Sequence, residues 1–88
     1  MSVYVDQPIY PYGRMMMCHM LADTEAELLE MADRIGVKRK WIQRKDVLHF
    51  DICKSKRKLA VDFGAIEIGR TELVNLMRRQ REHGHAKQ

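Results

Sequence analysis

Four side chains have the residue types that metal binding or proton transfer needs: His19, Asp23, His49 and Asp51. His19 interrupts the apolar run 15–22, where burying an imidazole is costly unless its ring nitrogens find partners. His49 and Asp51 are two positions apart, which places both on one face of a strand. Two imidazoles and two carboxylates suit a divalent metal, or a general base that is oriented by an acid.

A structural role accounts for the same residues. In that interpretation His19 and Asp23 cap each other's backbone, and His49 hydrogen-bonds locally to Asp51. The four residues match no established ligand spacing, such as paired cysteines or two histidines one helical turn apart. Both interpretations stay open at this point, and the sequence names no cofactor.

The basic residues form a second group, because they are concentrated in the middle of the chain. Between residues 34 and 58 lie Arg34, Lys38, Arg39, Lys40, Arg44, Lys45, Lys54, Lys56, Arg57 and Lys58. A helix beginning near Cys53 would present free amides, and Ser55, Lys56 and Arg57 would add donors for a phosphate. A solvated surface that keeps the domain soluble is the alternative.

These two groups lead to three functional hypotheses. The first is a small binding module for an anionic, phosphate-bearing ligand, either a nucleotide or a short nucleic acid. Its ligand-binding residues would be Arg14, Tyr12, Trp41, His49, Asp51, Ser55, Lys56 and Arg57, with Tyr12 or Trp41 stacking on a base. The second is a small metal-assisted or acid/base hydrolase that uses His19, Asp23, His49 and Asp51. The third is a dimeric protein-interaction module.

The strands and helices that position these residues can be predicted from hydrophobic periodicity and from the residues that end each element. Strands are predicted at 2–5, 15–22, 47–52 and 65–68, the second as a central strand covered on both faces. Residues 10–13 are predicted as a rigid aromatic loop, and residues 37–45 as a short strand or an extended loop.

The helices have recognisable ends. Thr24 and Glu27 form a capping box at the start of a helix over 24–35, and Gly36 ends it. A second helix is expected over 53–63, with Lys56, Leu59, Ala60 and Phe63 on one face and Gly64 at its end. A third helix begins at Thr71, with basic residues toward its end.

Length and composition limit the architecture. A chain of 88 residues with 45% hydrophobic side chains has room for one core, which excludes a multidomain enzyme. The alternation of elements predicts an α/β fold: a sandwich of one short mixed sheet of about four strands with about three helices. We expect a single domain over 1–82, a flexible tail over 83–88, and stabilisation by a homodimer.

The remaining composition bears on location and partners. The net charge of +4 favours anionic partners without implying a dedicated nucleic-acid arm. No apolar run is long enough to span a bilayer, and the N-terminus lacks a secretory signal, so we expect a cytoplasmic protein without membrane contact. Cys18 and Cys53 are expected to be free thiols.

Several short motifs occur together in this chain: Val3-Tyr4-Val5-Asp6, Met17-Cys18-His19-Met20, Ala22-Asp23-Thr24, Glu27-Leu28, His49-Phe50-Asp51-Ile52, Ser55-Lys56-Arg57 and Gly64-Ala65. As a set they resemble the bacterial and phage family called domain of unknown function four-zero-three-one, over about residues 2–68. The resemblance implies a small protein of bacterial or phage origin, and it transfers no catalytic assignment.

Overall fold

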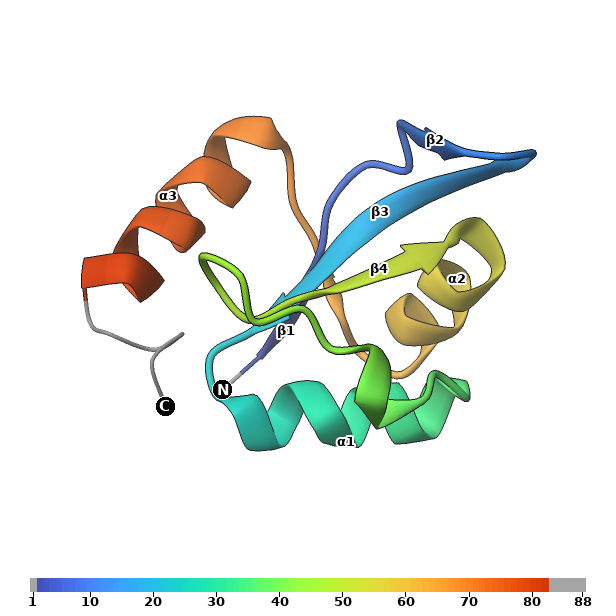
Figure 1. The fold of residues 1–88 in the computed structure, drawn as a ribbon, viewed down its shortest axis with the longest axis horizontal. Coiled ribbons are helices and arrows are strands. Elements are labelled where there is room, and N and C mark those ends of the chain that lie inside the picture. The colour runs from blue at the N-terminus through green and yellow to red at the C-terminus, as the bar shows by residue number, and fades with distance from the viewer. Residues whose placement is uncertain (1, 83–88) are drawn as a thin grey trace.

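A five-stranded mixed sheet forms the centre of the protein (Figure 1). The computed structural model describes residues 2–82, and the tail predicted over 83–88 lies outside the described residues. The strands are β1 (Val3–Val5), β2 (Tyr10–Tyr12), β3 (Met15–Ala22), β4 (Phe50–Cys53) and β5 (Ile66–Glu67). β3 is central, since it pairs antiparallel with β1, β2 and β4, while β5 joins β1 in parallel. The expected small α/β domain with a mixed sheet is confirmed.

The helices are α1 (Glu25–Ile35), the short 3-10 helix η1 (Arg39–Trp41), α2 (Lys54–Asp62) and α3 (Arg70–Glu82). The Thr24 hydroxyl accepts the Glu27 N–H at 3.2 Å and donates to the Glu27 carboxylate at 2.8 Å, so the predicted capping box is present. Gly36 ends α1 at φ 79°, in the left-handed region that favours glycine. Of these helices, none over residues 2–82 combines the length and apolar composition that crossing a membrane requires.

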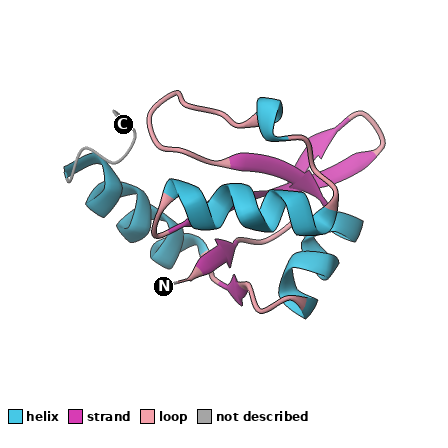
Figure 2. Ribbon diagram, turned by 90° about the horizontal axis from the view of Figure 1, so that it is seen from below, coloured by secondary structure: helices cyan, strands magenta, loops and turns pink. Residues whose placement is uncertain are grey.

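The two faces of the sheet are covered differently. α1 and α2 pack on one face of the sheet. This face is apolar because every second strand residue points toward the helices: Val3, Val5, Cys18, Met20, Ala22, Phe50 and Ile52. Figure 2 shows α1 lying across the sheet. On the other face, Leu73 and Leu76 of α3 cluster with Leu21 and Val47. α3 therefore covers only the part of this face near Leu21, and the part around His19 is left open.

Several sequence predictions were wrong in detail. Residues 10–13 are not all loop: Tyr10–Tyr12 form β2, a fifth strand. Pro11 is tolerated there because β2 is an edge strand. The first residues of β3, Met15 and Met16, are exposed, so the strand is covered on both faces only toward its end.

The middle of the chain also differs from expectation. Residues 37–45, expected as a short strand or an extended loop, have no strand and are irregular apart from η1 and a single bridge between Gln43 and His49. In α2 only Ala60 is buried, while Leu59 and Phe63 are 40% and 49% exposed. The helix therefore presents a narrower apolar face than its periodicity predicted.

Candidate functional site: a histidine and aspartate pair beside an aromatic pocket

A break between β1 and β2 creates the site. Both strands pair with the same edge of β3, but the ladder stops after the Asp6 N–H bonds to the His19 carbonyl at 3.2 Å. It resumes where Tyr10 pairs with Met17. Pro8 lies in the intervening segment, and it has no N–H to donate to a ladder. As a result the His19 N–H has no strand partner on this edge.

The Asp6 carboxylate takes the place of that partner. Its Oδ1 accepts the His19 main-chain N–H at 2.6 Å, and its Oδ2 accepts the His19 ring Nδ1–H at 2.8 Å. Asp6 is only 3% exposed, and a buried carboxylate is costly unless it is paired. These two bonds hold the imidazole in one orientation and leave its Nε2 free to face the open side of the sheet.

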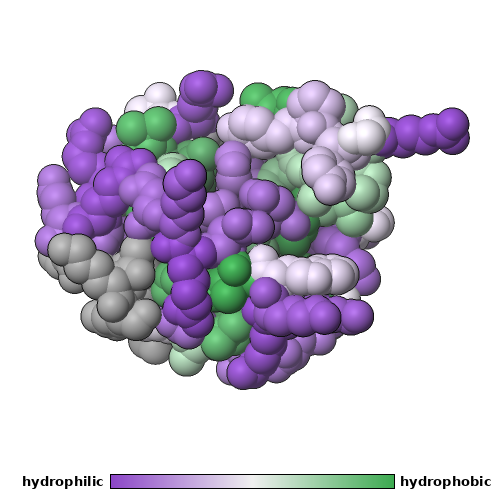
Figure 3. Space-filling model, in the orientation of Figure 1, coloured by the Kyte–Doolittle hydropathy of each residue, from purple (hydrophilic) through white to green (hydrophobic). Residues whose placement is uncertain are grey.

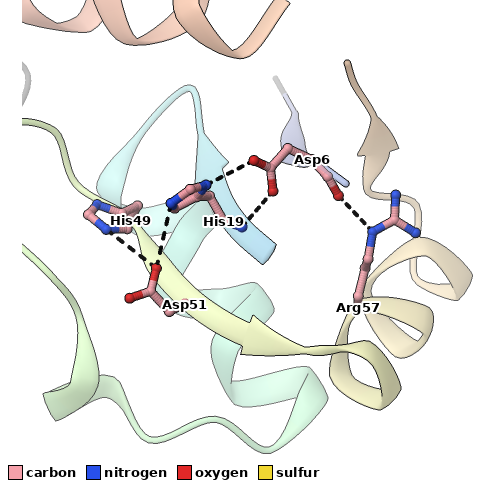
Figure 4. Close-up of polar contacts among 5 residues, drawn as sticks. All are labelled: Asp6, His19, His49, Asp51 and Arg57. Atoms are coloured by element: carbon pink, nitrogen blue, oxygen red, sulfur yellow. Dashed lines mark hydrogen bonds and ion pairs between the residues drawn. The ribbon is translucent and has the colours of Figure 1, made fainter. Parts of the chain in front are cut away.

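Strand register brings two more polar side chains to His19. Asp51 lies directly opposite it on β4, and His49 precedes Asp51 by two positions on the same face. Asp51 Oδ1 lies 3.9 Å from His19 Nε2 and 3.6 Å from His49 Nε2. The His49 Nδ1–H donates to the Val47 carbonyl at 3.0 Å. Both imidazoles thus point their Nε2 atoms toward one carboxylate (Figure 4).

The surroundings change the acidity of His19 and of two neighbouring groups. The hydrogen bond to Asp6 raises the pKa of His19 above its ordinary value of 6.5, although partial burial opposes this. Burial, and then the charge of Asp6, raises the pKa of Tyr10, so its phenol stays protonated and neutral at physiological pH. Burial raises the pKa of Cys18 to about 12, which makes its thiol unreactive.

A pocket of about 410 Å³ opens beside His19 and Asp51. Its lining is mostly apolar and aromatic: Tyr10, Pro11, Tyr12, Met17, Cys18 and Trp41, together with the polar His19, Gln43 and Asp51. The Tyr10 ring meets the His19 ring edge to face at 4.5 Å between centroids. An apolar pocket with a few convergent polar groups is the usual form of a small-molecule site.

The structure separates the residues predicted to bind a phosphate-bearing ligand. Tyr12, Trp41 and Asp51 line the aromatic pocket, with His49 next to Asp51. Ser55 and Arg57 line a different pocket of about 480 Å³, with Pro8, Lys54, Lys58, Val61 and Glu67. Arg14, in the turn between β2 and β3, lines neither pocket.

Three of the predicted phosphate contacts already have neighbours within the fold. Arg57 is mostly buried, and its Nε donates to the Asp6 carbonyl at 2.8 Å while its other end pairs with Glu67 at 3.0 Å. The Ser55 hydroxyl lies 3.3 Å from the Cys53 sulfur. The Lys56 ammonium lies against Gly36. Arg57 therefore supports the segment that carries Asp6.

The predicted cluster of four catalytic residues is only partly assembled. His19, His49 and Asp51 come together, whereas Asp23 accepts hydrogen bonds from the Ser2 N–H and the Tyr4 hydroxyl at 2.8 and 3.0 Å. His19 is bonded to Asp6, so the suggested mutual capping with Asp23 is wrong. Over residues 2–82, no group of three His, Cys, Asp or Glu side chains is arranged to hold a metal ion.

Sequence reasoning missed Asp6 and Gln43 as site residues, whereas Tyr10 belongs to the segment that was predicted as a rigid aromatic loop. Asp6 is an acidic residue directly after the apolar alternation of Val3 and Val5. The oddly placed His19 demanded a partner, and that was the only signal that pointed to a buried acid. Gln43 carries no local signal, since the bridge to His49 alone brings it to the pocket.

The fold and site thus define a small α/β domain with an aspartate-oriented histidine beside an aromatic pocket. A scan against protein families matches residues 3–80 to the family described as "Protein of unknown function (DUF4031)". Because the match covers most of the chain, the protein belongs to this family, which confirms the resemblance seen in the motifs. Searches of curated proteins and of solved structures gave no match.

Proposed function

We propose that this protein is a small acid/base enzyme in which His19 Nε2 transfers a proton to or from a ligand in the aromatic pocket. The observation that carries the proposal is the buried Asp6 carboxylate, 2.8 Å from His19 Nδ1. A carboxylate in this position fixes the tautomer and the ring orientation and stabilises the imidazolium that forms during proton transfer. The free Nε2 is then the reactive nitrogen, and it faces a pocket of about 410 Å³.

The nature of the neighbouring groups favours direct activation of water over covalent catalysis. Cys18 is among the residues that line the pocket, but its thiol packs in the core against α1 and α2, and burial raises its pKa to about 12. A thiol with such a pKa is a poor nucleophile. We therefore expect hydrolysis in which neutral His19 accepts a proton from water while the substrate is held against the aromatic wall.

A panel of p-nitrophenyl substrates tests this proposal: an acetate ester, a phosphomonoester and a phosphodiester. We expect turnover of at least one substrate, and a loss of about 100-fold or more in His19→Asn, which is the usual contribution of a general acid or base. Asp62→Asn, on the surface of α2, is the control, since it removes a carboxylate outside the pocket. Equal rates in wild type and His19→Asn would contradict the proposal.

Anion binding by the basic start of α2 is a second candidate function. The supporting observation is the pocket of about 480 Å³ that Lys54, Ser55 and Lys58 line at the first turns of a helix without early acidic residues. Pyrophosphate titration tests it. Lys54→Ala/Lys58→Ala should weaken binding, whereas Lys40→Ala/Lys45→Ala, with the same change in net charge, should not.

Dimerisation stays a prediction, which sedimentation of the purified protein tests directly.

A further inference from the structure

We infer that the aromatic pocket takes a ligand with a flat ring and a positively charged amine, the ring against Tyr10, Tyr12 and Trp41 and the amine at Asp51. The inference names the ligand class of the site proposed above and rests on that proposal. Three observations carry it: the charge of the pocket lining, the spare acceptor capacity of the Asp51 carboxylate, and the aromatic surface beside it.

The pocket is negative although the protein as a whole is positive. The chain carries 16 Lys and Arg against 12 Asp and Glu, yet no lysine or arginine lines this pocket within the described residues. Asp6 is paired with His19, which at most cancels its charge. Asp51 therefore adds a negative charge that protonation of His19 alone does not cancel. Such a site attracts a cation and repels a phosphate.

Asp51 has acceptor capacity to spare. Its side chain is 46% exposed, and its contacts with the two imidazoles, at 3.9 and 3.6 Å, are longer than hydrogen bonds. Among residues 2–82, no lysine or arginine forms an ion pair with it. An ammonium group at hydrogen-bond distance would gain a charge-assisted bond to this carboxylate.

Aromatic faces complete the arrangement. Trp41 is 55% exposed and Tyr12 is more exposed still, so both present ring surface to the solvent side of the pocket. The Lys38 ammonium lies 5.5 Å from the centroid of the Trp41 ring, so this ring already contacts a cation of the protein and the amine of a ligand belongs at Asp51. In Figure 3 the upper right, where Figure 1 shows the β2 and β3 hairpin, is mostly pale purple and pale green, which are intermediate values on the hydropathy scale. A planar ring can stack here with its amine toward Asp51.

Three indole compounds that differ only in charge test the inference: tryptamine, tryptophol and indole-3-acetate, which are cationic, neutral and anionic near neutral pH. Two-dimensional NMR titration at low salt gives both the affinity and the residues affected. We expect tryptamine to bind about tenfold more tightly than indole-3-acetate, with tryptophol between them, and with shifts at Tyr10, His19 and Trp41.

Variants assign the preference to the carboxylate. Asp51→Asn should bring tryptamine to the affinity of tryptophol, while Asp62→Asn, with the same change in net charge, should preserve the difference. The inference is overturned if indole-3-acetate binds as well as tryptamine, if Asp51→Asn keeps the preference, or if none of the three compounds shifts the pocket residues. These outcomes leave the His19→Asn hydrolysis result untouched, so the ligand class and the proposed function fail separately.

Discussion

Asp6 and His19 are joined by two hydrogen bonds that act on different parts of the histidine. One bond holds the main-chain N–H at 2.6 Å and the other holds ring Nδ1 at 2.8 Å. The first replaces a sheet hydrogen bond that is lost where β1 and β2 part, and the second orients the imidazole. A single buried carboxylate thus completes the sheet and prepares the candidate catalytic base, so its removal should affect both stability and proton transfer.

Stability should depend on pH through His19. Its pKa is raised in the folded protein above the ordinary value of 6.5, mainly by the hydrogen bond to Asp6. The contribution of protonated His19 to the free energy of unfolding is therefore fully present below about pH 6.5, and it is lost as the pH rises through the pKa of His19 in the folded protein. Urea unfolding of wild type and Asp6→Asn across this range measures it. We expect the difference in the free energy of unfolding between the two proteins to shrink at higher pH, and a constant difference would contradict the linkage.

The two carboxylates near His19 should contribute unequally to its pKa. Asp6 acts through a hydrogen bond and through its charge, whereas Asp51 acts through charge alone across 3.9 Å. NMR titration of the His19 ring should show a lower pKa in Asp6→Asn and a smaller decrease in Asp51→Asn. Asp62→Asn should leave the titration unchanged. If Asp51→Asn had the larger effect, the assignment of Asp6 as the orienting group would be wrong.

Arg57 should be a positioning residue for the segment that carries Asp6. Its Nε donates to the Asp6 carbonyl at 2.8 Å, and the Arg57 side chain is only 13% exposed. In Arg57→Ala this acceptor loses its partner, and we expect a loss of about 1–3 kcal/mol in the free energy of unfolding.

Glu67→Gln separates the two contacts of Arg57. It removes the ion pair to Arg57 and keeps the bond to the Asp6 carbonyl, and Glu67 is 57% exposed. Exposed pairs usually contribute about 0–1 kcal/mol. Urea unfolding should therefore show a much smaller effect than in Arg57→Ala. Equal losses in both variants would assign the role of Arg57 to the ion pair.

The two cysteines should differ in reactivity in the folded protein. Cys18 is buried and its pKa is raised to about 12, while the hydrogen bond from Ser55 lowers the pKa of Cys53 at the start of α2. Iodoacetamide should therefore modify Cys53 first, and mass spectrometry of the digested protein identifies the site. Cys53→Ser should remove the fast reaction, and unfolding in urea should make Cys18 reactive. Early labelling of Cys18 would contradict its burial.

The local features of the fold followed from the sequence. Thr24 and Glu27 mark the start of α1 because the Thr24 side chain accepts the free Glu27 N–H of the first turn. Gly36 marks its end because glycine adopts the left-handed conformation in which its own N–H reaches the last carbonyls of the helix. The alternation around β4 placed His49 and Asp51 on one face, because successive strand residues point to opposite sides. His19 was singled out because an imidazole in an apolar run needs a partner. Each of these inferences depends only on neighbours in the chain.

Tertiary structure alone decided which groups meet. Asp6 lies 13 residues from His19 and 51 from Arg57, and the packing of β1, β3 and α2 brings the three together. No periodicity encodes such pairings, because strand register is fixed by the burial of whole faces and not by adjacent residues. The pairing of β1 with β3 also placed Asp23 within hydrogen-bond distance of Ser2 and Tyr4. Because α3 packs near Leu21, it does not cover the sheet at His19. The sequence thus determined the helices, the strands and one unusual histidine, whereas long-range packing determined its partner and its pocket.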